Sequence, residues 1–311
     1  MKAPRIIVVG SVNTDMVIKG SRLPGPGETV TGGEFIMAAG GKGANQAVAA
    51  ARLGAEVTFI AKVGRDVFGD QAIENYRREG ICTDCILRDS ENATGVALIL
   101  VDDKGENSIS VASGANFALT PADVAGCADQ IRAADLVMFQ LETPLDTVLA
   151  AAKIAAEAGV PVILNPAPAA QLPVELLQYV TYLTPNETEA ERLTGMSVTD
   201  EGTAEKAARQ LLAAGPKCVI VTLGAKGALL VEADRALLVP SVPIKAVDTT
   251  AAGDAFNGAL AWSLGRELPL EQAVRQACMV GALSATRLGA QPSLPTQEEL
   301  NRFAERPQTG G

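Results

Sequence analysis

The stretch Val247-Asp248-Thr249-Thr250-Ala251-Ala252-Gly253-Asp254-Ala255-Phe256-Asn257-Gly258 decides how the rest of the chain is interpreted. It follows a short strand-like run at 237–240 and leads into an apolar, Ala-rich helix that ends near Gly265. Its three small residues at 251–253 lie where a loop becomes a helix. Small side chains let a ligand approach the backbone, and the free N–H groups of a first helical turn favour an anion. The stretch therefore predicts an anion-binding helix start.

Asp254 places a carboxylate at the start of the same helix. An acidic residue in a first turn also stabilises a helix that has no chemical role, so a capped helix is one interpretation. The other is a general base, because a carboxylate beside free amides can take a proton from a hydroxyl while the amides hold a phosphate. In either case the positive end of the helix is expected to lower the pKa of Asp254.

Composition excludes several classes of protein. Of the 311 residues, 48% are hydrophobic, and the net charge of −10 comes from acids and bases mixed along the chain. A nucleic-acid surface needs a basic patch, and a membrane helix needs roughly 20 apolar residues; the sequence has neither. We therefore expect no nucleic-acid partner and no membrane span. The length suits one large α/β domain with a small appendage, or two domains.

The absence of histidine narrows the chemistry. It removes Ser-His-Asp and Cys-His catalysis and histidine-ligated zinc, so an acid–base catalyst should be Asp or Glu. The five cysteines, at 82, 85, 127, 218 and 278, contain one lone C-x-x-C, which is too little for a zinc or redox site. An odd cysteine count, with a first strand in place of a signal peptide, predicts a cytoplasmic location.

Strands and helices alternate in the β-α-β rhythm of a mostly parallel sheet with helices on both faces. The predicted strands lie at 5–10, 56–61, 135–139, 160–164, 180–183, 217–222 and 227–231. The predicted helices lie near 44–53, 68–79, 121–131, 145–158, 187–194, 203–214, 253–264, 270–287 and 296–305. The fold class is therefore α/β and Rossmann-like. We expect a single domain over 1–311 with a disordered tail at 306–311.

Two segments that interrupt this rhythm predict a small second sheet. Residues 16–19 and 28–31 alternate in the manner of strands, and a similar pair at 94–102 and 107–112 is joined by a turn. We expect these insertions, at about 14–39 and 93–114, to form a β lid over the carboxyl edge of the main sheet. Such a lid excludes water during a reaction. Its apolar face would also suit a homodimer contact.

Polar and glycine-rich motifs cluster where predicted strands end. Asn13 and Asp15 follow the first strand and suit a polyhydroxyl ligand, although a turn also favours them. The loop Gly40-Gly41-Lys42-Gly43-Ala44-Asn45-Gln46 opens a helix without matching a P-loop, and it could equally be a turn with no ligand. Asn186 and Glu189 could hold Mg²⁺ through water, or cap a helix. The glycines of 224–227 leave room for a nucleotide.

Together with 248–256, the Gly-rich loop makes the chain resemble the ribokinase-like (PfkB) family of carbohydrate kinases over residues 5–303. Shorter matches, such as Gln140-Leu141-Glu142 and Gly289-Ala290-Gln291-Pro292-Ser293, favour the members that act on ribose. The resemblance implies a phosphotransferase with an alcohol acceptor. It would move the γ-phosphoryl group of Mg-ATP to the 5-hydroxyl of D-ribose, giving ribose 5-phosphate and ADP. It also implies a monovalent cation, usually K⁺.

The resemblance assigns roles to residues. Asp254 would be the base, with Ala251, Ala252 and Gly253 forming the anion hole beside it. The sugar would be held by Asn13, Asp15, Gly41, Lys42, Asn45, Glu142 and Asp254. ATP would be held by Asn186, Thr222, Gly224, Ala225, Gly227, Gly253 and Cys278, with Glu189 near Mg²⁺. The monovalent cation would be held by Asp248, Thr250, Ser284, Arg287, Gly289 and Ser293.

Two departures from the family pattern leave questions. Ala251 stands where the family most often has Gly, and Cys278 stands where it often has His or Asn. The acceptor could instead be deoxyribose, another furanose or a nucleoside, although the first half of the predicted site has no aromatic residue to stack on a base. From a different class, the chain could be a sugar or nucleotide sensor without catalysis, but such a protein should lose Asp254.

Overall fold

The computed structural model describes residues 2–305, so the tail predicted at 306–311 lies outside the described residues. Within 2–305 the main sheet has nine strands, in the order β13-β12-β11-β10-β9-β8-β1-β4-β5. They are β1 (Arg5–Val9), β4 (Glu56–Gly64), β5 (Ile86–Asp89), β8 (Leu136–Phe139), β9 (Val162–Leu164), β10 (Tyr182–Leu183), β11 (Cys218–Thr222), β12 (Ala228–Val231) and β13 (Ala236–Val239). All neighbouring pairs from β11 through β5 are parallel, whereas the β11–β12 and β12–β13 pairs are antiparallel. The predicted mostly parallel sheet is confirmed.

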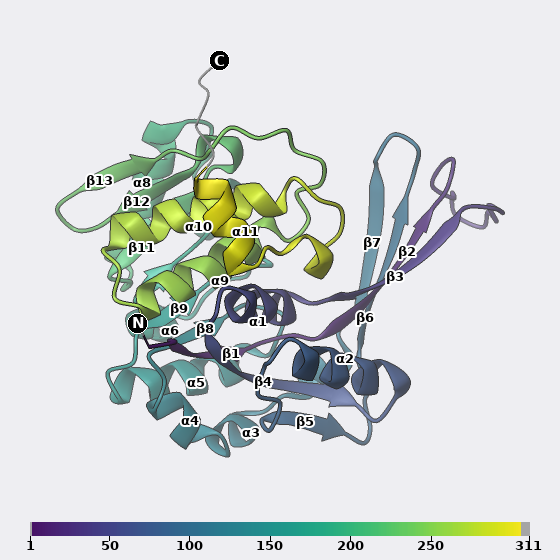
Figure 1. Cartoon of the computed structure of the whole chain (residues 1–311), viewed down its shortest axis with the longest axis horizontal. Coiled ribbons are helices and arrows are strands. Elements are labelled where there is room, and N and C mark those ends of the chain that lie inside the picture. The colour runs from purple at the N-terminus through teal and green to yellow at the C-terminus, as the bar shows by residue number, and fades with distance from the viewer. Residues whose placement is uncertain (1, 306–311) are drawn as a thin grey trace.

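Helices cover both faces of this sheet (Figure 1). One layer contains α1 (Lys42–Arg52), α2 (Val67–Arg78), α9 (Ala252–Gly265), α10 (Leu270–Ser284) and α11 (Gln297–Ala304). The other contains α3 (Pro121–Ala125), α4 (Ala128–Arg132), α5 (Leu145–Glu157), α6 (Val174–Tyr179), α7 (Glu187–Thr194) and α8 (Glu201–Ala213). Alternate residues of β1 enter the two cores, Ile6 and Val8 on one side and Ile7 and Val9 on the other. No helix in residues 2–305 has the length and apolar character needed to cross a bilayer.

The lid is a separate four-stranded sheet that stands off one side of the molecule (Figure 1). Its strands are β2 (Asn13–Lys19), β3 (Glu34–Gly40), β6 (Gly95–Val101) and β7 (Asn107–Ala112), in the order β3-β2-β6-β7. β2 follows the carboxyl end of β1, and Asn13 pairs with both Gly40 and Gly95. The base of the lid therefore lies at the edge of the main sheet where polar residues were predicted to gather.

Several boundaries differ from the sequence prediction. The prediction of a strand at 28–31 is wrong. The chain turns at Gly32 and Gly33, which have φ of 93° and 104°, and the strand that follows them is β3. Gly40, the first residue of the predicted Gly-rich loop, is instead the last residue of that strand. The helix predicted at 121–131 is two short helices, α3 and α4, and β5 and α6 were missed. β12 is antiparallel because only the 3₁₀ turn η2 (Gly224–Lys226) separates it from β11.

The close crossing of α1 and α9 positions the site. At Gly258 a Cβ would lie 2.5 Å from the Cβ of Ala49 and 3.0 Å from the backbone N of Ala50. The two helices therefore approach more closely than larger side chains would allow. This contact brings the start of α1, with Asn45 and Gln46, against the start of α9, with Asp254.

Candidate active site

Asp254 is the buried centre of the site. Its side chain is only 6% exposed, and it accepts a hydrogen bond from Asn45 Nδ2 at 2.9 Å and another from Gln46 Nε2 at 3.0 Å. Burial raises the pKa of Asp254, while Lys42, Asn45 and Gln46 oppose that rise. The expectation that the helix start would lower this pKa is wrong, because removing the carboxylate from water dominates. A raised pKa suits a general base better than a lowered one.

The start of α9 leaves backbone N–H groups free beside this carboxylate. Ala252 N donates to Thr249 O at 3.1 Å, so its N–H is engaged. The N–H groups of Gly253 and Asp254 have no hydrogen-bond partner among the described residues, and a Cβ added at Gly253 would meet nothing within 4 Å. An anion has both donors and space here.

Ala251 occupies a backbone conformation that favours glycine. Its φ is 60° and its ψ is 10°, in the left-handed region, where a Cβ costs about 1–2 kcal/mol. This is the position at which the chain departs from the Gly of the family pattern. The departure therefore stores strain at the edge of the anion site.

Replacing Ala251 with Gly should therefore stabilise the protein. The relieved strain exceeds the entropy that glycine adds to the unfolded chain, so we expect a gain of about 0.5–1 kcal/mol in the free energy of unfolding. Urea unfolding measures it. Ala252→Gly is the matched control. Because Ala252 lies within α9, this substitution should lower the free energy of unfolding by a similar amount. Equal effects of the two substitutions would contradict the assignment of strain to Ala251.

Predicted sugar-binding residues converge near Asp254 from β2, from α1 and from the turn between β3 and α1. Asn13 and Asp15 lie on β2, and Lys42 and Asn45 lie on α1. Gly41 joins β3 to α1 with φ of 92°, and a Cβ there would lie 2.8 Å from Asn13 N. The predicted residues are thus held together by backbone approaches that only glycine permits.

The charges of these residues act on one another. Burial, together with the negative charges of Glu142 and Asp254, raises the pKa of Asp15 to about 6. Burial opposes the charge of Lys42, but Asp254, Glu142 and Glu189 outweigh it and raise the pKa of that amine. Lys42 is thus held as a cation among carboxylates.

Two positioning residues were not found from the sequence. Asn116, which is 1% exposed, donates through Nδ2 to Asn13 Oδ1 at 2.8 Å, so the amide nitrogen of Asn13 is left to face a ligand. Ser11 Oγ donates to Glu142 Oε2, which also accepts from Lys42 N at 3.0 Å. Asn116 lies 103 residues from Asn13, on the 3₁₀ turn η1 (Gly114–Ala118) that packs against β4 and β6, so the fold brings the two residues together.

Most of the predicted nucleotide residues lie along the neighbouring strand ends, whereas Gly253 lies on α9 and Cys278 on α10. Asn186 and Glu189 form a capping box at the start of α7, with Asn186 N donating to Glu189 Oε2 at 2.9 Å. Asn186 also bridges Thr222 at the end of β11. Gly224 and Ala225 are exposed. Gly227 has φ of 109° and lies against the backbone of Val239 and Ser241. Cys278 is buried on α10, with Sγ 4.0 Å from Val239 O, and burial raises the pKa of its thiol to about 12.

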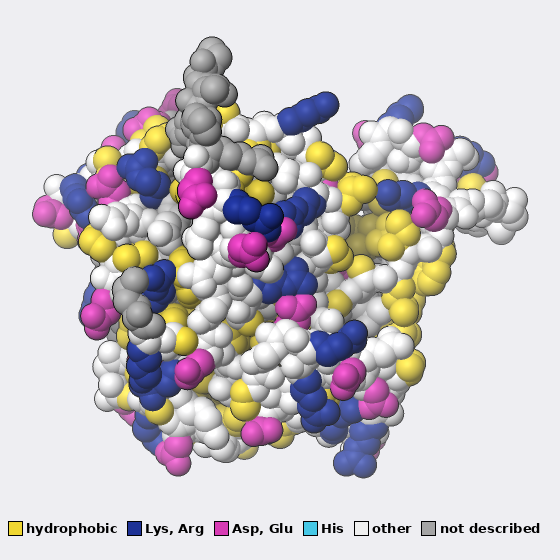
Figure 2. Space-filling model, viewed as in Figure 1, with side chains coloured by type: hydrophobic (Ala, Val, Ile, Leu, Met, Phe, Trp, Pro, Cys, Tyr) yellow, Lys and Arg dark blue, Asp and Glu magenta, His cyan; other side chains and the backbone are white. Residues whose placement is uncertain are grey.

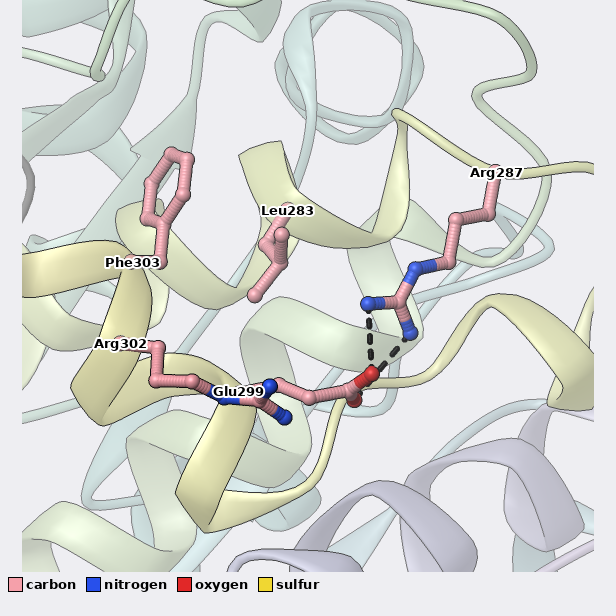
Figure 3. Close-up of a pocket in the computed structure, with 5 residues that line it drawn as sticks. All are labelled: Leu283, Arg287, Glu299, Arg302 and Phe303. Carbon is pink, nitrogen blue, oxygen red and sulfur yellow. Dashed lines mark hydrogen bonds and ion pairs between the residues drawn. The ribbon is translucent and has the colours of Figure 1, made fainter.

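The predicted cation residues form two segments joined by hydrogen bonds. Asp248 accepts from Thr250 N and from Gly289 N, both at 2.9 Å. Ser284 Oγ lies 2.8 Å from Ser293 Oγ. Arg287 turns its guanidinium to Glu299, at 3.1 and 2.7 Å (Figure 3), which leaves only its backbone oxygen for a cation. The fit to a monovalent cation therefore rests on oxygen donors next to the start of α9.

Comparisons with known proteins give one consistent result. A family model described as "pfkB family carbohydrate kinase" matches residues 3–297. The chain is 46% identical to the ribokinase of Haemophilus influenzae, over 96% of this chain and 98% of that protein. It is 39% identical to the deoxyribokinase of Salmonella typhi, over 96% and 98%. Its structure matches Arabidopsis thaliana ribokinase complexed with ribose and ATP, with a TM-score of 0.92, 32% identity, and 98% and 100% of the two chains covered.

Proposed function

The chain belongs to the pfkB family of carbohydrate kinases, and from this premise we propose that it phosphorylates D-ribose at the 5-hydroxyl with ATP, giving ribose 5-phosphate and ADP. One observation carries the proposal. A buried carboxylate, Asp254, lies beside two free N–H groups of α9 and against the Gly-rich start of α1. A base, an anion site and the proposed sugar-binding residues of α1 therefore lie next to one another.

The proposed sugar-binding residues would each make a different contact with the sugar and together align it. Asp15 is suited to accept two hydroxyl hydrogen bonds once it is ionised, and Asn13 is oriented by Asn116 to donate through Nδ2. Glu142, held by Ser11 and Lys42 N, supplies further acceptors. These groups would fix the sugar so that its 5-hydroxyl faces Asp254, which accounts for much of the catalytic advantage in a reaction between two bound substrates.

Phosphoryl transfer needs alignment and charge stabilisation more than covalent help. Asp254 would accept the hydroxyl proton, and the free N–H groups of Gly253 and Asp254 would donate to the oxygens of the transferred group. Because the transition state is loose, the proton can leave late, and a carboxylate is basic enough for this role. Lys42 would add positive charge to a site that already holds three carboxylates.

Asn186, Thr222, Gly224 and Gly227 would hold ATP, with Glu189 near Mg²⁺ through water. The support is their common position at the ends of β10 and β11. When bound, Mg²⁺ neutralises phosphate charge. The capping box already engages Glu189, so its contact with the ion would be indirect. Asp248, Thr250, Ser284, Arg287, Gly289 and Ser293 would hold K⁺ and fix the loop before α9.

The enzyme is further proposed to be a cytoplasmic homodimer joined through the lid. The lid face opposite Asp15 carries Met16, Ile18, Phe35, Met37, Leu98 and Leu100. All of these except Met37 line an apolar hollow of about 340 Å³. Phe35 is 61% exposed and Leu98 is 53% exposed. Hydrophobic side chains are visible over the lid in Figure 2. A second copy of the same face would cover this surface, and exposed apolar area of this kind marks interaction sites.

Replacing Leu98 with Asp should convert the dimer into a monomer. A charge at the centre of an apolar contact is desolvated without a partner, which costs several kcal/mol. Sedimentation velocity would show the change in mass. Val174→Asp is the matched control, because Val174 is 62% exposed on α6 of the main body. A wild-type protein that is already monomeric, or a Leu98→Asp variant that stays dimeric, would refute the lid interface.

A panel of acceptors tests the proposed substrate. Ribose, 2-deoxyribose, other furanoses and nucleosides are supplied with Mg-ATP, with and without K⁺, and ADP release is measured. We expect ribose to give the highest kcat/KM and K⁺ to raise the rate. Preference for deoxyribose would favour the activity named for the Salmonella relative. No ADP release above the ATP background for any acceptor would favour the sensor.

A further inference from the structure

Gln46 is a fully buried residue that touches the base but has no assigned role. It is 0% exposed, and its Nε2 lies 3.0 Å from Asp254 Oδ1 and 3.1 Å from Asn165 Oδ1. Its Oε1 accepts from Gln140 Nε2 at 2.6 Å, and Gln140 is also 0% exposed. Three side-chain amides therefore form a continuous buried relay that ends on the carboxylate.

The orientation of these amides is set by the main-chain oxygen of Thr184, which can only accept hydrogen bonds. Asn165 Nδ2 donates to the main-chain oxygen of Thr184 at 3.1 Å, which forces Asn165 Oδ1 to face Gln46. Gln46 must then present Nε2 to Asn165, and the Asp254 carboxylate makes the same demand. Gln46 Oε1 is left to face Gln140, which must donate to it. All three amide orientations follow from Thr184 O and Asp254.

The relay holds one carboxylate oxygen of Asp254 and leaves the other facing Asn45, at the Gly-rich start of α1. Gln46 holds Oδ1, whereas Oδ2 is contacted by Asn45, which belongs to the proposed sugar-binding set. We propose that Gln46 is a positioning residue for Asp254, fixing the carboxylate through Oδ1 so that Oδ2 meets the acceptor hydroxyl. This inference rests on the proposed function, because it assumes that Asp254 is the base.

The packing around the relay supports a fixed orientation. Gly10 lies directly against Gln140, and a Cβ at Gly10 would collide with Gln140 Oε1 and lie 2.7 Å from Gly43 Cα. On the other side, Thr184 Oγ1 donates to Asn257 Oδ1 at 2.7 Å, and Asn257 Nδ2 donates to Gly253 O at 2.8 Å. The network thus extends to the first turn of α9 and has little freedom to rearrange.

The test compares Gln46→Met with Gln140→Met. Methionine keeps the length of glutamine and removes its hydrogen bonds. Lys42, Glu142, Asp15 and Glu189 also act on Asp254, and they are unchanged in both variants. For Gln46→Met we expect kcat to fall about 10–100-fold. The acid limb of the plot of kcat against pH should move up by about one pH unit, because the Asp254 carboxylate loses a hydrogen-bond donor. KM for ribose and for ATP should stay within about threefold, since the change concerns the reacting oxygen more than binding.

Gln140→Met should leave the acid limb where it is, since Asp254 and Asn165 still orient Gln46. An unmoved acid limb in Gln46→Met, or an equal shift in both variants, would overturn the proposal. Gln46→Glu is a second test if Gln46→Met does not fold. The introduced carboxyl group can donate to Asp254 while it is protonated, so kcat should fall on the alkaline side as that group ionises. A flat alkaline profile would also overturn the proposal.

Asp254→Asn, assayed in parallel, separates this inference from the proposed function. Wild-type turnover in Asp254→Asn would show that the assignment of the base is wrong. Lost turnover in Asp254→Asn, together with an unmoved acid limb in Gln46→Met, would overturn only the role of Gln46.

Discussion

Asp254→Asn is expected to lower kcat by about 10²–10⁴-fold while sugar and ATP still bind, because a general base typically contributes that much. The substitution keeps the shape of the side chain and removes its ability to take a proton. The introduced amide would keep its oxygen toward Gln46 Nε2 and turn its nitrogen toward Asn45. Asn45 can accommodate this by rotating its own amide, since its Oδ1 is buried without a partner. The variant should therefore fold.

Calorimetric titration with ribose and with a non-hydrolysable ATP analogue would measure binding, and ADP release would measure turnover. Affinities within about threefold of wild type, with turnover lost, are the expected result. Near-wild-type turnover would contradict the role of Asp254. Lost binding together with lost turnover would assign Asp254 to holding the sugar.

Asp15→Asn is expected to raise KM for ribose about 10–100-fold with a smaller effect on kcat. The ionised carboxylate can accept two hydroxyl hydrogen bonds, and a bond to a charged group is worth about 1.5–3 kcal/mol. The amide keeps one acceptor oxygen and replaces the other with a donor. Since Asp15 lies on the lid and Asp254 on α9, the substitution should weaken binding without removing the base.

The pH dependence of KM provides the control for Asp15. Its pKa is raised to about 6, so the carboxylate needed for binding is present above that value and is lost as the pH falls through it. KM for ribose in the wild type should therefore rise as the pH drops below about 6. Asp15→Asn should lack this dependence because it has no proton to gain. The same profile in both proteins would show that another group controls binding.

The sequence predicts the α/β class and the edge of the sheet that carries the site, because both follow from local patterns. Asn13, Asn186 and Thr222 each stand after a buried run, and parallel strands place such ends together. Small residues at 251–253 signal a close approach of ligand and backbone. The antiparallel direction of β12 cannot be predicted from a local sequence pattern. It depends on how few residues connect it to β11 and on which edge remains open.

The supporting residues of the site are also beyond local patterns. Asn116 acts on Asn13 because the fold packs η1 against β4 and β6, and nothing in the neighbouring sequence marks it. Gln46 stands inside the Gly-rich motif, but its contact with Asp254 spans 208 residues and depends on the crossing at Gly258. The raised pKa of Asp254 is beyond local patterns for the same reason. The helix start is visible in the sequence, whereas the burial that outweighs it is produced by the fold.

The position of the phosphate in the product tests the central claim most directly. Ribose is incubated with Mg-ATP and K⁺, and the product is identified by phosphorus–proton correlation NMR for the wild type and for Asp254→Asn. We expect ribose 5-phosphate from the wild type and almost none from the variant. Phosphate on another hydroxyl, or no sugar phosphate from the wild type, would contradict it.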